Sequence, residues 1–365
     1  MATPSNPNGP AVHVAPPLPP PRGPLTSELF SRLRRPPHDL GDIPAPDGDV
    51  LSDGDVLSDD DLQLALYACY ELHYRSFRDV DDRWEWHPGL LRWRAALEAG
   101  FEAGLARLVA EGSGRPVPTA SAEEELWQLI AEADGPSLSG YVAGRGTLAE
   151  VRELAVHRSP YQLKEADPHT WALPRLTGGP KAAMVEIQAD EYGGGRAEAM
   201  HSSLFAATME ELGLDPAYGA YLDLVPGVTL ATVNVISLFG LHRRLRGALV
   251  GHLAVFEMTS VGPMARYSAA LGRLGIGDRG RRFYEVHVEA DAHHQFVAAR
   301  DLAGGLAAAE PDLVPDISFG ARAVMALEGR FTAHVLEAWA GGRTSLRRPL
   351  AVRPAVQEAH CAAGR

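Results

Sequence analysis

Apolar residues recur at helical spacing in nearly every segment past Pro160, and this periodicity limits the fold more than any other feature of the sequence. Glycine and proline punctuate these segments at "TGGPK", "LGLDP", "LVPG" and "EPDLVPD". No strand-like alternation of apolar and polar residues persists beyond a few positions. We therefore predict an all-α protein with its core over residues 151–345.

The N-terminal part has a different composition. Residues 1–57 are rich in Pro, Gly and Asp, repeat the sequence "DGDVLS" and lack apolar periodicity, which predicts a disordered arm. The repeated acids lack the spacing and the closing Glu of an EF-hand, so a solvated acidic linker is favoured over a calcium site. Ser58 and the acids after it form a helix start, and residues 58–150 are predicted to be an N-terminal helical region. Residues 346–365 are predicted to be a tail.

Composition excludes several classes of protein. The 365 residues, 45% of them hydrophobic, can bury a large core. The net charge of −13 opposes binding to a phosphate backbone, so we expect no nucleic-acid partner. Cys69 and Cys361 are too few for a disulfide framework or a thiolate metal site. Neither a spanning apolar stretch nor a signal peptide is evident in the sequence, so we expect no membrane segment and a cytoplasmic location.

The stretch "YEVHVEADAHH", residues 284–294, is the densest in metal-binding side chains. At about 100° per residue, His287, Asp291 and His294 fall within roughly 60° of one another on one helix face. His293 points elsewhere. Two imidazoles and a carboxylate on one face form a partial shell for iron or another divalent ion of the first transition row. The alternative is a solvated polar face of a helix.

Candidate ligands also occur on separate helical segments with apolar neighbours. Glu257 stands in the apolar segment "GHLAVFEMTSVGPM", where a lone carboxylate is costly to bury unless it is paired or coordinated. The other candidates are Glu165, Glu186, Asp190, Glu191 and His201. Together these histidines and carboxylates make the ligand set of a di-iron carboxylate site in a helical bundle.

Three consecutive glycines, residues 193–195, separate Glu191 from His201. Each glycine costs about 1 kcal/mol relative to alanine inside a helix, so this segment is predicted to be kinked or unwound. Two interpretations remain open: a turn between two helices, or a segment that becomes ordered only with metal.

The order of seven of these residues resembles that of the haem-oxygenase-like di-iron oxidases, which are also described as iron-containing redox enzymes. The resemblance covers about residues 155–340 and rests on "DEYGGGR" before the first histidine and on the His-x-x-x-Asp-x-x-His pattern. It implies a haem-oxygenase-like helical bundle, here with an N-terminal helical extension. The residues that it implies as ligands of two Fe²⁺ ions are Glu165, Glu191, His201, Glu257, His287, Asp291 and His294.

Glu165 matches an additional carboxylate of those family members that oxygenate nitrogen, and the resemblance gives it a catalytic role as well. The implied activity is oxidation of a small amine nitrogen with O2 as co-substrate, giving a hydroxylamine, nitroso or nitro product in specialised metabolite biosynthesis. An aminoheterocycle is one such amine. Two alternatives are oxidative C–C cleavage or desaturation of a fatty or amino acid, and metal binding without catalysis.

Two partners are expected. The sequence contains no flavin, nicotinamide or iron–sulfur motif, so a ferredoxin, a reductase or a small reductant must supply electrons to the iron. The segment 58–112 has more aromatic side chains than two helices need internally, which predicts docking on the core and a homodimer. These side chains are Tyr67, Tyr70, Trp84, Trp86 and Trp93.

Overall fold

The computed structural model describes residues 15–41, 55–112 and 121–351. Within these three ranges the regular structure is helical and no strand occurs, which confirms the all-α prediction. The α-helices are α1 (Pro24–Leu33), α3 (Asp60–Glu71), α4 (Pro88–Gly112), α5 (Ala122–Ala131), α6 (Leu138–Arg145), α7 (Leu148–Gln162), α8 (Asp167–Thr170), α9 (Gly178–Glu191), α10 (His201–Glu211), α11 (Gly227–Leu241), α12 (Arg246–Arg273), α13 (Asp278–Phe296), α14 (Gly305–Ala309) and α15 (Val314–Ala340). A π-helical segment, Val297–Gly304, joins α13 to α14.

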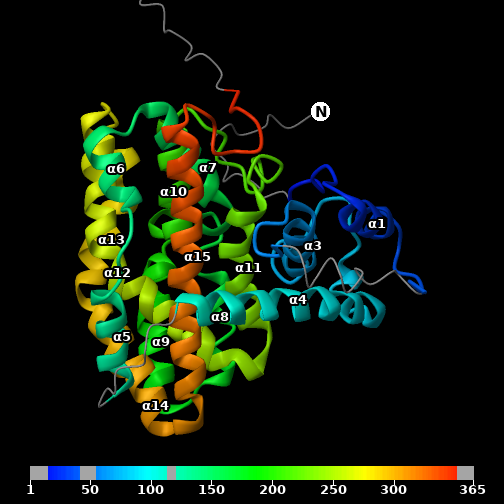
Figure 1. The fold of residues 1–365 in the computed structure, drawn as a ribbon, viewed down its shortest axis with the longest axis horizontal. Helices are drawn as coiled ribbons and strands as arrows, with labels where there is room; N and C mark the ends of the chain where they lie inside the picture. Colours follow the sequence, from blue (N-terminus) through cyan, green and yellow to red (C-terminus); the bar gives the residue numbers. More distant parts are fainter. Residues whose placement is uncertain (1–14, 42–54, 113–120, 352–365) are drawn as a thin grey trace, which may run out of the picture.

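Helix α12 lies beside α13 (Figure 1) and packs extensively against both α13 and α15. Glycine allows α12 and α15 to approach closely: a Cβ on Gly251 would overlap the carbonyl oxygen of Ile317, and a Cβ on Gly320 would overlap that of Ala248. Because the two backbones touch here, neither position has room for a larger side chain. This contact fixes the helix that carries Glu257.

The N-terminal helices pack against the same bundle. Helix α3 is buried along most of its length and lies against α11, while α4 runs from α3 to α15 (Figure 1). Helix α6 packs on α12, and α5 packs on α15. Helix α7 begins at Leu148, so the predicted boundary at residue 150 falls inside a helix and marks no break in the fold.

The prediction of a disordered arm over residues 1–57 is wrong for the described residues 15–41. Leu29, Phe30 and Leu33 of α1 are buried, and α1 packs against α3. The guanidinium of Arg22 donates hydrogen bonds of 2.7 Å to two backbone carbonyls in the segment before α11. Leu25, Leu29, Phe30 and Leu33 do recur at helical spacing, but this short pattern stands between proline-rich segments, and the Arg22 contacts span about 200 residues of sequence. Residues 1–14 and 42–54 lie outside the described residues.

The predicted tail also begins with packed residues. Leu346 is buried, and the backbone N–H of Arg347 donates to the carbonyl of Leu224 at 2.9 Å. The Arg347 side chain pairs with Asp60 at the start of α3. Residues 346–351 therefore dock on the fold, and residues 352–365 lie outside the described residues.

The aromatic side chains of the N-terminal region are mostly used inside the protein. Tyr67, Tyr70, Trp84 and Trp93 are buried, whereas Trp86 is 59% exposed. The aromatic surface that motivated the homodimer is therefore reduced to Trp86, and the homodimer stays a prediction.

One helix among the described residues, Arg243–Arg273, is long and apolar enough to cross a membrane by length and composition. In the fold, 56% of its most apolar window is buried. A core helix satisfies the same two criteria, so this helix is no argument for a membrane.

We expect Phe30→Ala to lower the free energy of unfolding by about 3–5 kcal/mol, because the ring is fully buried and its removal leaves a cavity. Denaturant unfolding followed by circular dichroism measures this loss. The control is Trp86→Ala, which removes an exposed aromatic side chain of the N-terminal region and should change the free energy by less than about 0.5 kcal/mol. An unchanged stability of Phe30→Ala would mean that α1 does not pack as described.

Candidate metal centre

The structure brings all seven predicted ligand residues together in two buried groups. The first, named here the Glu165 group, consists of Glu165, Glu191, His201 and His287. The second, the Glu257 group, consists of Glu257, Asp291 and His294. Within each group, one nitrogen or oxygen atom per residue lies within 4.8 Å of the corresponding atom of every other member. The possible ligand atoms of each group are therefore close enough together to bind one metal ion.

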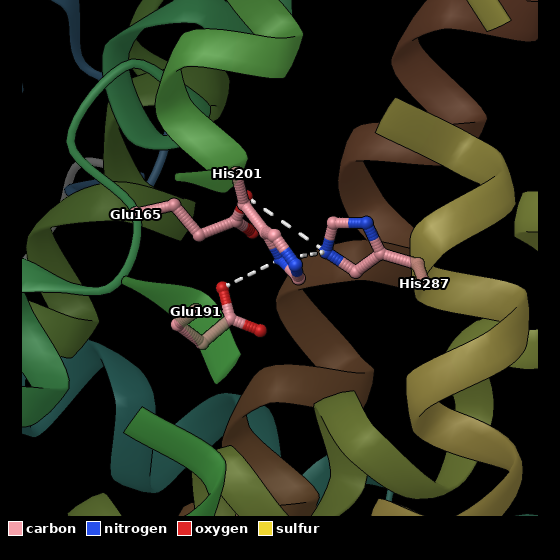
Figure 2. Close-up of side chains that lie close together, drawn as sticks. All are labelled: Glu165, Glu191, His201 and His287. Atoms are coloured by element: carbon pink, nitrogen blue, oxygen red, sulfur yellow. Dashed lines mark hydrogen bonds and ion pairs between the residues drawn. The ribbon is translucent and has the colours of Figure 1, made fainter. Parts of the chain in front are cut away.

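The Glu165 group is assembled from four segments, and its side chains point toward one another (Figure 2). Glu191 is the last residue of α9, His201 is the first of α10, and His287 lies on α13. Nδ1 of His201 is 3.0 Å from a carboxylate oxygen of Glu191 and 3.1 Å from Nε2 of His287. A carboxylate oxygen of Glu165 lies 3.9 Å from the same Nε2 atom.

The three glycines allow the chain to turn so that the side chains of Glu191 and His201 lie close together. Helix α9 ends at Glu191 and α10 begins at His201, which confirms that the segment is not a continuous helix. Gly193 has a φ of 63°, and a Cβ there would lie 2.5 Å from the carbonyl carbon of Ala199. Both the positive φ and the lack of space for a Cβ require glycine at position 193. The structure thus contains the turn, and ordering by metal stays a prediction.

The Glu257 group joins α12 to α13. Nδ1 of His294 is 3.5 Å from a carboxylate oxygen of Glu257 and 3.6 Å from one of Asp291. The other oxygen of Asp291 accepts a hydrogen bond from the Ser260 hydroxyl. The side chain of His293 is 69% exposed, as the helical arithmetic predicts, and pairs with Glu186 on α9.

Buried polar atoms without hydrogen bonds concentrate in these two groups. One oxygen each of Glu165, Glu191, Glu257 and Asp291 and Nδ1 of His294 are buried and make no hydrogen bond with another described residue. Leaving carboxylate oxygens in this state is costly unless a cation compensates. A mixed set of carboxylates and imidazoles suits iron or manganese. The residues present therefore fit a pair of such ions.

Three groups of the site, Glu257, Glu165 and His294, hold their protons more firmly than usual when no metal is bound. Burial, with the nearby carboxylates of Asp291 and Glu191, raises the pKa of Glu257 to about 8. Burial and the neighbouring carboxylates also raise the pKa of Glu165 well above its usual range. Burial opposes the charged form of His294, but the adjacent carboxylates of Asp291 and Glu257 raise its pKa to about 10. A metal ion must displace these protons.

Partners outside the two groups orient the imidazoles. Nδ1–H of His287 donates to the carbonyl of Phe283 at 2.7 Å, which leaves Nε2 free to bind a metal. Nε2–H of His294 donates to Asp190 at 3.1 Å, which leaves Nδ1 for the metal. Asp190, a candidate ligand from the sequence, therefore belongs to neither group and holds a ligand instead.

A cavity of about 370 Å³ opens on both groups. Five of the seven residues line it, namely Glu165, Glu191, Glu257, His287 and Asp291. Its wall also contains an ion pair between Arg158 on α7 and Glu328 on α15, with two contacts of 2.8 and 2.7 Å. Sequence reasoning missed this pair, because its two members lie 170 residues apart and no local pattern relates them.

We expect Asp291→Ala to lower the affinity for Fe²⁺ or Co²⁺ by at least about tenfold while the fold is kept, because the variant loses a buried carboxylate ligand. His293→Ala should leave the affinity unchanged, since His293 faces solvent. Metal titration at fixed pH measures both. Equal losses in the two variants would mean that the wrong face of α13 has been assigned to the metal.

Asp190→Asn should lower metal affinity by about 10- to 100-fold, the usual effect of removing a carboxylate that orients a histidine ligand. Glu186→Gln is the matched control, because Glu186 lies one turn earlier on α9 and contacts the solvent-facing His293. Metal titration should show a loss for Asp190→Asn alone. A similar effect of both changes would indicate a general response to the loss of charge on α9.

Metal affinity should rise between pH 6 and 8. Glu257 must lose its proton to bind metal, and its pKa of about 8 keeps the carboxyl group protonated over this range. Each proton displaced adds about a tenfold gain in affinity per pH unit below the pKa. Co²⁺ titrations at several pH values test this, with Glu257→Gln expected to give a shallower slope. A wild-type affinity independent of pH would contradict the prediction.

Two comparisons with known proteins are consistent with this centre. Residues 152–329, which contain all seven residues, match the family described as iron-containing redox enzyme. Nitrosourea synthase from Streptomyces achromogenes subsp. streptozoticus is 28% identical over 171 residues, which are 46% of this chain and 36% of that protein. The match thus spans about a third of that relative's length. Residues 152–329 of the helical bundle thus resemble the iron-containing redox enzymes, and the bundle has a haem-oxygenase-like fold.

Proposed function

We propose that the chain is a non-haem di-iron oxygenase that uses O2 to oxidise the nitrogen of a small amine to a hydroxylamine, nitroso or nitro product. The observation that carries the proposal is the position of Glu165, which lies with Glu191, His201 and His287 and also lines the cavity. The match to a protein named for a nitroso product supports the proposal. Specialised metabolite biosynthesis is the proposed context, with an aminoheterocycle among the candidate amines.

The Glu165 group and the Glu257 group would hold the two Fe²⁺ ions. When bound, the ions would supply electrons to O2. The chain itself would position the amine in the cavity between the metal groups and the apolar side chains of Leu253 and Phe256. The carboxyl group of Glu165 has a pKa raised by burial, so its ionised form would readily accept a proton from the amine nitrogen.

The wall of the cavity is mostly apolar but contains a few polar groups that a small amine could contact. Arg158 and Glu328 form a net-neutral pair in its wall, and Gln162 has a buried side-chain oxygen without a hydrogen bond to any described residue. An alkyl chain would leave the Gln162 oxygen unpaired, at a cost of about 1–3 kcal/mol, whereas Arg158 and Glu328 already pair with each other. A small amine can form a hydrogen bond with the Gln162 oxygen. The Gln162 oxygen thus favours an amine, while desaturation or C–C cleavage of a fatty acid is the alternative that the apolar wall would also accommodate.

The proposed partners follow from the same chemistry. An external ferredoxin, reductase or small reductant would return the irons to Fe²⁺, and the chain is proposed to act as a homodimer in the cytoplasm. Neither nucleic acid nor a membrane is a proposed partner.

Oxygen uptake by protein loaded anaerobically with Fe²⁺ tests the proposal. We expect small amines to stimulate uptake and to give products carrying added oxygen on nitrogen, detected by mass spectrometry. Uptake with fatty or aliphatic acids alone would overturn N-oxygenation. Binding of one zinc ion per chain with no oxygen uptake would favour metal binding without catalysis.

The variant Glu165→Gln distinguishes the role of Glu165 in binding metal from its role in the reaction. The group keeps three other ligand residues, so we expect the variant to retain part of its iron and to lose at least about 100-fold in the rate of amine oxidation, the usual range for removal of a proton acceptor. His293→Ala serves again as the control with full iron and full rate. A Glu165→Gln variant with the wild-type rate would remove the observation on which the proposal depends.

A further inference from the structure

Glu165 is the one member of the two groups that lies outside a helix. Helix α7 ends at Gln162 and α8 begins at Asp167, so Glu165 belongs to a short connection over residues 163–166. The other six residues are held by helical hydrogen bonds. The position of Glu165 therefore depends on what fixes this connection.

Helix α3 fixes the connection through a buried ion pair. The ammonium of Lys164, the neighbour of Glu165, donates to the carboxylate of Glu71 at 2.8 Å, and the two residues are 1% and 0% exposed. The Tyr218 hydroxyl donates to the same carboxylate at 2.7 Å. The ammonium also lies over the ring of Tyr74, 4.3 Å from its centroid. Both charged groups are thus buried, and their contacts hold each side chain in one orientation.

A second contact from the residues after α3 holds the same connection. The guanidinium of Arg75 donates to the backbone carbonyl of Leu163 at 2.9 Å. Beyond the connection, Asp167 accepts a hydrogen bond of 2.8 Å from the hydroxyl of Tyr192, the residue that follows Glu191. The connection is therefore tied to the N-terminal helices on one side and to the Glu191 segment on the other.

We propose that Glu71 is a positioning residue for the metal centre: through Lys164 it sets the placement of Glu165, so that a helix outside the segment matched by the family model controls metal binding at the Glu165 group. The proposal rests on the metal-binding part of the proposed function and not on the choice of substrate. It requires that loss of the ion pair weakens the Glu165 group and spares the Glu257 group, whose residues lie on α12 and α13.

The physical basis is the cost of moving a buried charge. An ammonium without its carboxylate partner would be left in a site closed to water, so the Lys164 side chain has one low-energy direction while the pair is intact. Glu71→Gln removes the charge of the partner, and the backbone on both sides of Lys164 becomes free to shift. Partners that orient metal ligands usually change affinity by about 10- to 100-fold when removed.

Co²⁺ titration of the full chain under anaerobic conditions tests the proposal, with calorimetry and visible absorption as readouts. Two background variants allow metal binding at each group to be measured separately. His294→Ala weakens binding at the Glu257 group, and His201→Ala weakens binding at the Glu165 group. We expect Glu71→Gln to lower Co²⁺ affinity at least about tenfold in the His294→Ala background and to leave it unchanged in the His201→Ala background. A structural defect of the fold would lower both.

The chain offers a matched control in the Arg94–Glu98 pair of α4. These side chains are also buried, with a contact of 3.1 Å, and neither residue belongs to the metal groups or to the cavity wall. Glu98→Gln should destabilise the fold as Glu71→Gln does, yet leave both metal affinities unchanged. Titrations are carried out well below the melting temperature of each variant.

A second variant keeps the test valid if Glu71→Gln does not fold. The double change E71M/K164M replaces both charges with apolar side chains and leaves no lone buried charge. It should fold and still lower Co²⁺ affinity at the Glu165 group alone. If Glu71→Gln or the double variant matches Glu98→Gln at both groups, the inference is overturned. If the wild-type chain binds no Co²⁺, the proposed di-iron function fails instead.

Discussion

The burial of four carboxylates and three imidazoles within one helical bundle is the constraint on which the rest of the structure depends. Two groups of such side chains, enclosed by apolar helices, contain oxygen and nitrogen atoms without hydrogen bonds to other described residues. A bundle with this interior is stable only when cations or protons compensate the charge. The raised pKa of Glu257 shows how a proton compensates the buried charge when no metal is bound. The mixed set of carboxylates and imidazoles suits compensation by metal ions.

Closely packed helices hold the residues of this cluster in place. Backbone contact at Gly251 and Gly320 fixes α12 against α15, and α13 packs along α12 so that Asp291 and His294 face Glu257. The N-terminal helices also hold the cluster, since α3 lies along α11 and contacts the connection that carries Glu165 through Glu71. Although the family match begins at residue 152, the centre is thus assembled with parts of the chain before it.

The sequence was informative where local geometry determines the site. Residues on one helix obey the 3.6-residue period, so the shared face of His287, Asp291 and His294 followed from spacing alone. The loop glycines indicated the break between Glu191 and His201 for the same local reason. Contacts between distant segments have no such signature: the contact of Glu71 with Lys164 spans 93 positions, and no local pattern indicates it. Helix α1 was missed because its short amphipathic pattern lies between proline-rich segments whose composition suggested disorder.

The metal groups and the cavity share the same walls, and this couples ligation to substrate binding. Five of the seven residues that could hold metal also line the cavity, and Glu165 follows the C-terminal end of α7, the helix that carries Arg158. A substrate that contacts the Arg158–Glu328 pair would therefore extend along α7 toward Glu165. Because Lys164 and Glu165 are neighbours on one short connection, the buried contact of Glu71 with Lys164 acts at the junction of the metal site and the cavity. The position of this one carboxylate thus links the N-terminal helices, the metal and the space where a substrate would bind.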